Sequence, residues 1–295
     1  MHPNNPLPVI KHGWMRAVLF LFAYISCAIL AGIISNLLLT GSLTVMKGTG
    51  LAEQTLSSVI LTVGIATILI IALTVIFRRF IDRRSIKSMG FQWAPFQVDA
   101  FIGFNLGITL LGSATLLLHV TGNIEWSEAH FNAGDLSKGL FLMVLIAITE
   151  ELVFRAYILN NLLDSLNKWV ALGVSAGMFT LAHASNPGIS SVAVANILLA
   201  GALLGINYIY TRNIWFAVFF HFSWNFIQGP ILGYTVSGLP LQGILQPDLK
   251  GPWWLTGGAF GLEGSFITTC VLVITLLFLY ITYEKNTNKT VKASQ

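Results

Sequence analysis

One stretch of the chain decides its fold: residues 139–161 read GLFLMVLIAITEELVFRAYILNN. It is long enough to cross a bilayer as a helix, because a hydrocarbon core of about 30 Å needs about 20 mostly apolar residues. Three charged side chains, Glu150, Glu151 and Arg155, lie inside it. A charge at the centre of a spanning helix costs about 2.5–3.5 kcal/mol on insertion scales, so charges at this depth are candidates for function.

The whole chain has the composition of a membrane protein. Of its 295 residues 55% are hydrophobic and 9% are charged, and the mean hydropathy is +0.76. Soluble domains carry about 25% charged residues, so this chain has too little polar surface for a water-soluble globule. Cys27 and Cys270 both lie in apolar runs, and two such cysteines cannot build a disulfide framework or a zinc site. The basic residues lie in short loops, which indicates membrane orientation and no nucleic-acid partner.

The apolar runs predict an all-α polytopic protein of the cell membrane, with about eight transmembrane helices. They lie at residues 17–40, 56–77, 100–121, 139–161, 169–185, 190–210, 214–230 and 264–283. With the N-terminus in the cytoplasm, 12 Lys and Arg residues fall in cytoplasmic segments, and only Lys47, Lys138 and Lys250 fall on the other side. Basic residues favour the cytoplasmic side, so both termini are predicted there.

The same reading divides the chain into a cytoplasmic tail at 1–16, a transmembrane domain at 17–283 and a polar cytoplasmic tail at 284–295. The connections at 122–137 and 231–263 hold charged residues, Gly, Pro and the pair Trp253-Trp254, which is typical of loops at the membrane surface.

The three charges of residues 139–161 have different prospects of pairing. Glu151 and Arg155 are four residues apart, so they share a helix face and can form an ion pair. Glu150 is rotated by about 100° from Glu151 and has no such partner on its own helix. It needs a group from another helix, a water molecule or a proton, and a carboxylate in that position suits a general base. The structural alternative is an ion network that only fixes helix packing.

Two later segments supply candidate partners for Glu150. His183 ends a predicted helix just before Asn186-Pro187, and His221 lies four residues before Asn225, on one helix face. If these groups converge on one water molecule, Glu150 would take its proton, His183 would hold or share that proton, and His221 with Asn225 would donate to an oxyanion. From spacing alone the two histidines could exchange roles. Counting the helical rise from the nearest loops puts His183 nearly two turns farther from the cytoplasm than Glu150, so for the two to meet, the helix before His183 must begin deeper than its apolar run indicates or tilt strongly.

These residues resemble the motifs of the CPBP family, the CAAX proteases and bacteriocin-processing enzymes, also known by the Abi name and including the Ras-converting endopeptidases. The family pattern is Glu-Glu-x-x-x-Arg, then Phe-x-x-x-His, then His-x-x-x-Asn or Asp. The matching positions, in order, are Glu150-Glu151-x-x-x-Arg155, Phe179-x-x-x-His183 and His221-x-x-x-Asn225. The resemblance is firm over residues 145–230. It extends more loosely to Asp82-Arg83-Arg84 with Gly90-Phe91, and to Gly257-Gly258 with Phe260-Gly261-Leu262-Glu263-Gly264.

The resemblance implies an eight-helix intramembrane protease with a CPBP-like core at about 139–230 and a catalytic cavity between the fourth, fifth and seventh helices. It implies roles for the six motif residues: water activation by Glu150 and His183, oxyanion stabilisation by His221 and Asn225, and orientation of the site by Glu151 and Arg155.

A divalent metal, zinc, is the one cofactor to consider, since members of the family are often labelled metalloproteases. Glu150, His183 and His221 could supply the three protein ligands of a catalytic zinc site. The sequence has no His-Glu-x-x-His motif and no set of cysteine ligands, so no metal is firmly predicted.

The leading functional hypothesis is therefore hydrolysis of a peptide bond in or near the lipid bilayer, by water that reaches Glu150 from the cytoplasmic side. The expected partners are a peptide or membrane-protein substrate, including a lipidated C-terminal tail, and a role in bacteriocin self-immunity fits the same chemistry. One alternative is a transporter or proton relay that uses the buried Glu and His residues. Another is a non-catalytic membrane scaffold that keeps the protease fold.

Overall fold

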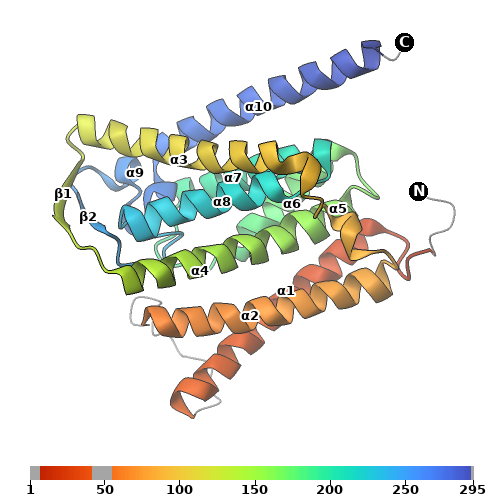
Figure 1. Cartoon of the computed structure of the whole chain (residues 1–295), viewed down its shortest axis with the longest axis horizontal. Helices are drawn as coiled ribbons and strands as arrows, with labels where there is room; N and C mark the ends of the chain where they lie inside the picture. The colour runs from red at the N-terminus through yellow and green to blue at the C-terminus, as the bar shows by residue number, and fades with distance from the viewer. Residues whose placement is uncertain (1–6, 42–54, 294–295) are drawn as a thin grey trace.

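The computed structural model describes residues 7–41 and 55–293 of the chain as a bundle of helices with a small β-ribbon at one end (Figure 1). Lys47, one of the three basic residues predicted outside the cytoplasm, is not among the described residues. The long helices are α1 (Gly13–Thr40), α2 (Leu56–Ile76), α3 (Gln97–Val120), α4 (Ala133–Glu151), α6 (Lys168–Ala182), α7 (Ser191–Thr211), α8 (Trp215–Phe226) and α10 (Phe266–Ala293). The short elements are α5 (Asn160–Leu162), α9 (Trp253–Thr256), the π-helices η2 (Phe77–Ile81), η5 (Leu152–Leu159) and η6 (Ile227–Ile231), and the 3-10 turns η3 (Ile86–Met89), η4 (Ala94–Phe96), η7 (Gly258–Phe260) and η8 (Leu262–Gly264).

The helices are those of a multi-pass membrane protein. Of the helices in the described part of the chain, 5 are long and apolar enough to cross a bilayer: Gly13–Thr40, Leu56–Ile81, Ile86–Val120, Ser191–Thr211 and Phe266–Asn286. Large apolar side chains such as Phe22, Leu38 and Ile68 point outward from them, where lipid can cover them. The predicted segments 139–161, 169–185 and 214–230 also fall on helices, but α6 has only 15 residues and α8 only 12. The count of eight crossings therefore stays a prediction.

The helix ends are arranged as an even number of crossings requires. In Figure 1, α1 begins and α10 ends at the same end of the bundle, and the β-ribbon lies at the opposite end. The predicted location of both termini in the cytoplasm stays a prediction.

Both predicted tails are partly helical. Helix α1 begins at Gly13, four residues before the predicted start, because Arg16 is buried in ion pairs and so belongs to the bundle. Helix α10 continues to Ala293, ten residues past the predicted end. The salt bridge of 3.0 Å between Glu284 and Lys168 joins this extension to α6.

A buried ion cluster ties α1 and α2 to the end of the helix that contains residues 139–161. Its centre is the Asp82 carboxylate, which is 0% exposed. Four side chains donate to it: Arg16 at 3.3 Å, Arg78 at 2.8 Å, Tyr157 at 3.0 Å and Asn161 at 3.2 Å. Because both arginines are also buried, this cluster fixes the first two helices against the core.

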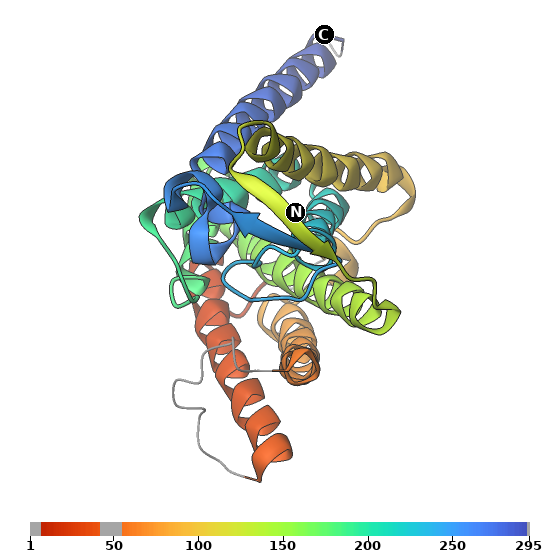
Figure 2. The same cartoon turned by 90° about the vertical axis from the view of Figure 1, so that its left-hand side faces the viewer.

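The β-ribbon was not predicted. Strand β1 (Ile124–Ala129) pairs antiparallel with β2 (Leu245–Leu249), in the register Ile124 with Leu249 and Glu125 with Asp248 (Figure 2). Both strands lie in segments that the sequence indicated as surface loops. The ribbon forms because two connections far apart in the chain meet at the same end of the bundle, and it joins the α3–α4 connection to the α8–α10 connection.

Helices α3 and α8 approach each other closely at two glycines of α3, four residues apart. A Cβ atom added at Gly103 would lie 2.3 Å from the carbonyl oxygen of Phe216, and one added at Gly107 would lie 2.2 Å from Ser223 Oγ. Small residues at this spacing let two helix backbones come into contact. The contact fixes α8, which carries His221.

We expect Gly103→Ala to destabilise the protein by about 1–3 kcal/mol, because the added methyl group must push α8 away. Gly112→Ala on the same helix is the matched control, since no atom lies within 4 Å of its added Cβ. Alanine favours a helix over glycine, so the control should keep or slightly raise the melting temperature of the detergent-purified protein. Equal melting temperatures for the two variants would contradict the close contact.

Candidate active site

The two glutamates lie where helix α4 widens into a π-helix. Glu150 and Glu151 are the last residues of α4, and η5 continues directly from Leu152. Such π-turns inside longer helices are frequent at functional sites. Every residue from Glu151 to Leu162 is buried, so this helix is enclosed by the bundle on all sides.

Glu151 binds two groups with one oxygen. Its Oε1 atom accepts a hydrogen bond of 3.0 Å from Arg155 Nη1, the pair that their spacing predicts. The same oxygen lies 2.8 Å from His221 Nδ1 on α8. Arg155 also donates to the carbonyl oxygen of Gly201 on α7, at 3.1 Å. These contacts hold three helices together and fix the plane of the His221 ring.

His183 is held by the residue one turn before it. It caps the C-terminal end of α6, and its Nδ1 atom lies 2.8 Å from the carbonyl oxygen of Phe179. The Phe179 ring in turn packs against the His183 ring, with 4.5 Å between centroids, and under the Arg155 guanidinium at 4.6 Å. A carbonyl oxygen only accepts, so Nδ1 of His183 carries the hydrogen, and the same reasoning applies to His221 beside a carboxylate. The Nε2 atoms of both rings are left for chemistry.

Both Nε2 atoms face Glu150. The Oε2 atom of this glutamate lies 3.7 Å from His183 Nε2 and 3.9 Å from His221 Nε2. It is buried, and it has no hydrogen-bond partner among the described residues. The two separations are too long for direct hydrogen bonds and are of the size that a bridging water spans. The structure thus brings together the unpaired carboxylate and the two imidazoles that the sequence singled out.

The mismatch in depth between Glu150 and His183 that the helical rise gives is absent from the structure, where the two side chains are 3.7 Å apart. The helix that holds Glu150 continues to Leu162, which is about 18 Å further on. Helix α6 then returns over 15 residues, or about 22 Å, so its end lies level with Glu150. The depth prediction placed the cytoplasmic boundary too close to Glu150, because it assumed a fixed core thickness and missed the length of this helix.

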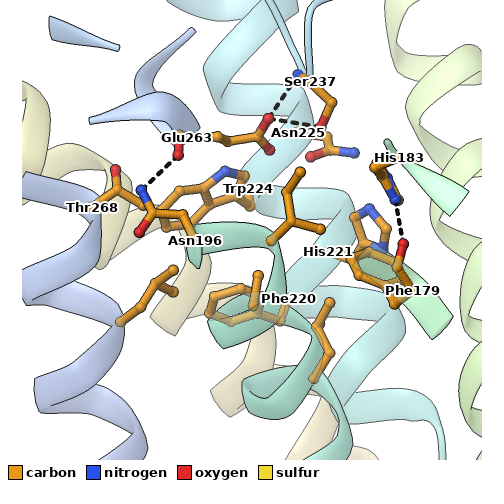
Figure 3. Close-up of a pocket in the computed structure, with 14 residues that line it drawn as sticks. Phe179, His183, Asn196, Phe220, His221, Trp224, Asn225, Ser237, Glu263 and Thr268 are labelled. Carbon is orange, nitrogen blue, oxygen red and sulfur yellow. Dashed lines mark hydrogen bonds between the residues drawn. The ribbon is translucent and has the colours of Figure 1, made fainter. Parts of the chain in front are cut away.

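A pocket opens beside the two histidines (Figure 3). It encloses about 520 Å³ of empty space, counting the space at its mouth. His183, His221 and Asn225 line it, as the motifs predict, but none of its lining residues comes from α4. The predicted cavity between the fourth, fifth and seventh helices is therefore only partly correct. Helices α7 and α10 complete the walls, with Asn196, Ile197, Ala200, Leu204, Thr268 and Leu272.

Asn225 presents its side-chain amide to this pocket. Its side chain is buried, and no described residue forms a hydrogen bond with its amide. Figure 3 labels it on the same side of the pocket as Ser237, one helix turn from His221. An amide with an unused N–H donor at this place can stabilise a negative oxygen on a substrate.

Glu263 is a pocket residue to which the sequence gave no role. It lies in η8, within the loosely matching segment Gly257–Gly264, and its Oε2 atom accepts two hydrogen bonds from Ser237, from N–H at 2.6 Å and from Oγ–H at 2.7 Å. Burial raises the pKa of the Glu263 carboxyl group, and the two Ser237 donors oppose that shift. Only the Phe-Gly-Leu-Glu-Gly stretch could have drawn attention to it.

The candidate ligand atoms are spaced slightly wider than those of an ideal tetrahedral zinc site. Tetrahedral zinc holds its ligand atoms about 2.0–2.2 Å away and so roughly 3.4 Å from one another. The separations of 3.7 Å and 3.9 Å from Glu150 Oε2 to the two Nε2 atoms are wider. In the described part of the chain, no three His, Cys, Asp or Glu residues are grouped as metal ligands. No catalytic step is therefore assigned to a metal.

Comparison with known families agrees with this site. Residues 132–227 match the family model described as type II CAAX prenyl endopeptidase Rce1-like, and this range contains all six motif residues. Residues 5–124 match the model of the Srg family chemoreceptor, and that range contains none of them. No curated protein and no solved structure matches the chain. Over residues 132–227 the chain is thus similar to the type II CAAX prenyl endopeptidases, which are membrane-embedded proteases.

Proposed function

We propose that this protein is an intramembrane endopeptidase in which Glu150 activates a water molecule for attack on a peptide bond. The observation that carries the proposal is the buried Glu150 Oε2 atom, which has no hydrogen-bond partner among the described residues and faces two imidazole Nε2 atoms at 3.7 Å and 3.9 Å. Helix packing alone does not require a carboxylate oxygen in that state, because leaving it unpaired is costly.

The reaction begins with a water molecule between Glu150 and the imidazoles. Glu150 takes a proton from this water while the oxygen of the water bonds to the carbonyl carbon of the substrate. His183, whose Nδ1–H is held by the Phe179 carbonyl, accepts this proton from Glu150 at Nε2 and gives it to the leaving nitrogen, so that Glu150 returns to its carboxylate form. The carbon–nitrogen bond then breaks, and the products are a carboxylic acid and an amine.

His221 and Asn225 act on the carbonyl oxygen. Asn225 donates from its amide, which is unused among the described residues. His221 donates from Nε2 when its ring is protonated, and the Glu151 carboxylate at Nδ1 stabilises that charge. Each such donor to a developing oxyanion contributes about 10²–10³ in rate. Glu151 and Arg155 are positioning residues, because they act through His221 and the surrounding helices.

The substrate class follows from where the site lies. A peptide or a segment of a membrane protein can reach a centre buried between helices of a membrane protein, and a lipidated C-terminal tail would enter from the bilayer. Processing of a small peptide, including one tied to bacteriocin self-immunity, needs the same groups. The proposed arrangement keeps both termini in the cytoplasm and the catalytic core at about 139–230.

The test is peptide hydrolysis by the purified protein in detergent, with wild type compared to His183→Ala. We expect the variant to lose about 10²–10⁴-fold in kcat, because it lacks the group that shares the proton. His119→Ala is the control, since His119 is exposed at the end of α3. This variant should cleave the peptide at the wild-type rate.

Cleavage by His183→Ala at the wild-type rate would remove His183 from the mechanism. No cleavage by wild type, together with ion-dependent uptake into vesicles, would replace the proposal by a transporter.

A further inference from the structure

Glu263 presents a carboxylate oxygen to the pocket that the proposed hydrolysis does not use. Its Oε2 atom is occupied by the two donors of Ser237. Among the described residues, none donates a hydrogen bond to Oε1, and no lysine or arginine forms an ion pair with the carboxylate. Figure 3 shows this carboxylate on the same wall as Ser237, above Trp224.

The carboxylate is held in a fixed position. Asn196 on α7 donates to the backbone oxygens of Glu263 at 2.7 Å and of Ser265 at 2.8 Å, which anchors the segment. Ser237 adopts a φ of 49°, in the left-handed region, and Asn186 donates to its carbonyl oxygen at 2.9 Å. A group fixed in this way on both sides is preorganised to bind a ligand.

The rest of the pocket is mostly apolar. Figure 3 places Phe220 at the far end from Ser237, and Ile197, Ala200, Leu204, Trp224 and Leu272 give the pocket aliphatic and aromatic wall surface beside its polar lining residues. A pocket with apolar wall surface and a carboxylate at one side suits a long cationic side chain, because the methylene stem packs on that surface while the charged head meets the carboxylate. Glu263 is half-buried, and a cationic ligand would offset the partial loss of water around its carboxylate.

We infer that Glu263 determines specificity in a subsite that binds a lysine or arginine side chain of the peptide substrate, close to the bond that is cut. The inference rests on the proposed function, because the same pocket is lined by His183, His221 and Asn225. Glu263 itself binds the substrate and takes no part in the proton transfers.

The competing explanation is that Glu263 only clamps the loop of Ser237. The Glu263→Gln variant separates the two roles, since the glutamine oxygen can still accept both bonds from Ser237 while the negative charge is gone. If Glu263 only holds the Ser237 loop, this variant should behave as wild type. If Glu263 binds a basic side chain, the variant should lose that binding.

The experiment compares peptides that carry lysine, arginine or the neutral isostere norleucine at each position around the cut. We expect wild type to favour the basic residue at one position by about 10- to 100-fold in kcat/KM, the range of a hydrogen bond to a charged group. Glu263→Gln should lose this preference and still cleave the norleucine peptide. Asp248→Asn, an exposed carboxylate on β2, should keep the wild-type preference.

Equilibrium binding of the lysine and norleucine peptides to the same proteins keeps the two proposals apart. If wild type cleaves no peptide yet binds the lysine peptide more tightly, and Glu263→Gln does not, the subsite stands and the proposed hydrolysis fails. If wild type cleaves peptides without favouring a basic residue at any position, the subsite is overturned while the hydrolysis stands. The peptide preference of wild type alone can therefore overturn the subsite, even if Glu263→Gln does not fold.

Discussion

Glu150→Gln is expected to cleave peptides about 10²–10⁴-fold more slowly than wild type, the contribution typical of a general base. Glutamine has nearly the same shape as glutamate but cannot accept the proton of the attacking water. The loss should appear in kcat and leave KM nearly unchanged, because Glu150 acts on the water while other groups bind the peptide. Initial rates on one peptide, measured over a range of concentrations, give both constants.

The fold should survive this change. Glu150 Oε2 has no hydrogen-bond partner among the described residues, so the substitution breaks no bond at that atom. Glu128→Gln is the matched control, because Glu128 is exposed on β1 and its carboxylate pairs only with the exposed His130 among the described residues. A Glu150→Gln variant as active as the Glu128→Gln control would remove Glu150 from the chemistry.

The second large effect is expected on stability, from Asp82→Asn. This change removes the negative charge that Arg16 and Arg78 share, and both guanidinium groups are 1% exposed. Arg16 keeps Asp164 as a partner at 2.7 Å, but Arg78 keeps only neutral acceptors on Ser88. Removing one partner of a buried ion pair costs about 3–5 kcal/mol, so we expect a large fall in the melting temperature in detergent.

Arg84→Gln is the control for this prediction, because it removes a charge from the rim of the same cluster. Arg84 pairs with Asp164 at 2.8 Å, and the two side chains are 19% and 18% exposed. Pairs near the surface contribute about 0–1 kcal/mol, so the control should melt close to wild type. Similar falls in melting temperature for the two variants would mean that the buried Asp82 pairs stabilise the fold no more than the Arg84 pair at the surface does.

The helices could be predicted because a bilayer demands a simple pattern. Long apolar runs such as 56–77 and 190–210 fall on α2 and α7, with ends within a few residues. Less predictable were the ends set by polar contacts between distant residues. Arg16 appeared to lie in a tail, because the sequence does not reveal that Asp82, 66 residues away, neutralises it.

The core of the candidate site was also accessible from sequence, because charged groups inside apolar helices are few. Spacing within one helix predicted the pair of Glu151 with Arg155, and the order of the motifs predicted that His183 and His221 approach Glu150. Spacing did not predict that Glu151 also orients His221 through Nδ1, since that contact depends on how α8 packs against α4.

The remaining parts depend on contacts between segments that look like ordinary loops. The strands Ile124–Ala129 and Leu245–Leu249 are short and lack a clear alternation of polar and apolar residues, so neither shows its pairing in sequence. Glu263 joins the pocket only because the connection from α8 to α10 folds back over the histidines and is anchored there by Asn196.

The most direct test of the central claim is cleavage of a peptide in water enriched in oxygen-18, followed by mass spectrometry of the products. Glu150-activated attack predicts one oxygen-18 atom in the new carboxyl group from the first turnover onward, and almost no product from Glu150→Gln in the same time. A first-turnover product without oxygen-18, or labelled product formed by Glu150→Gln at the wild-type rate, would contradict water activation by Glu150.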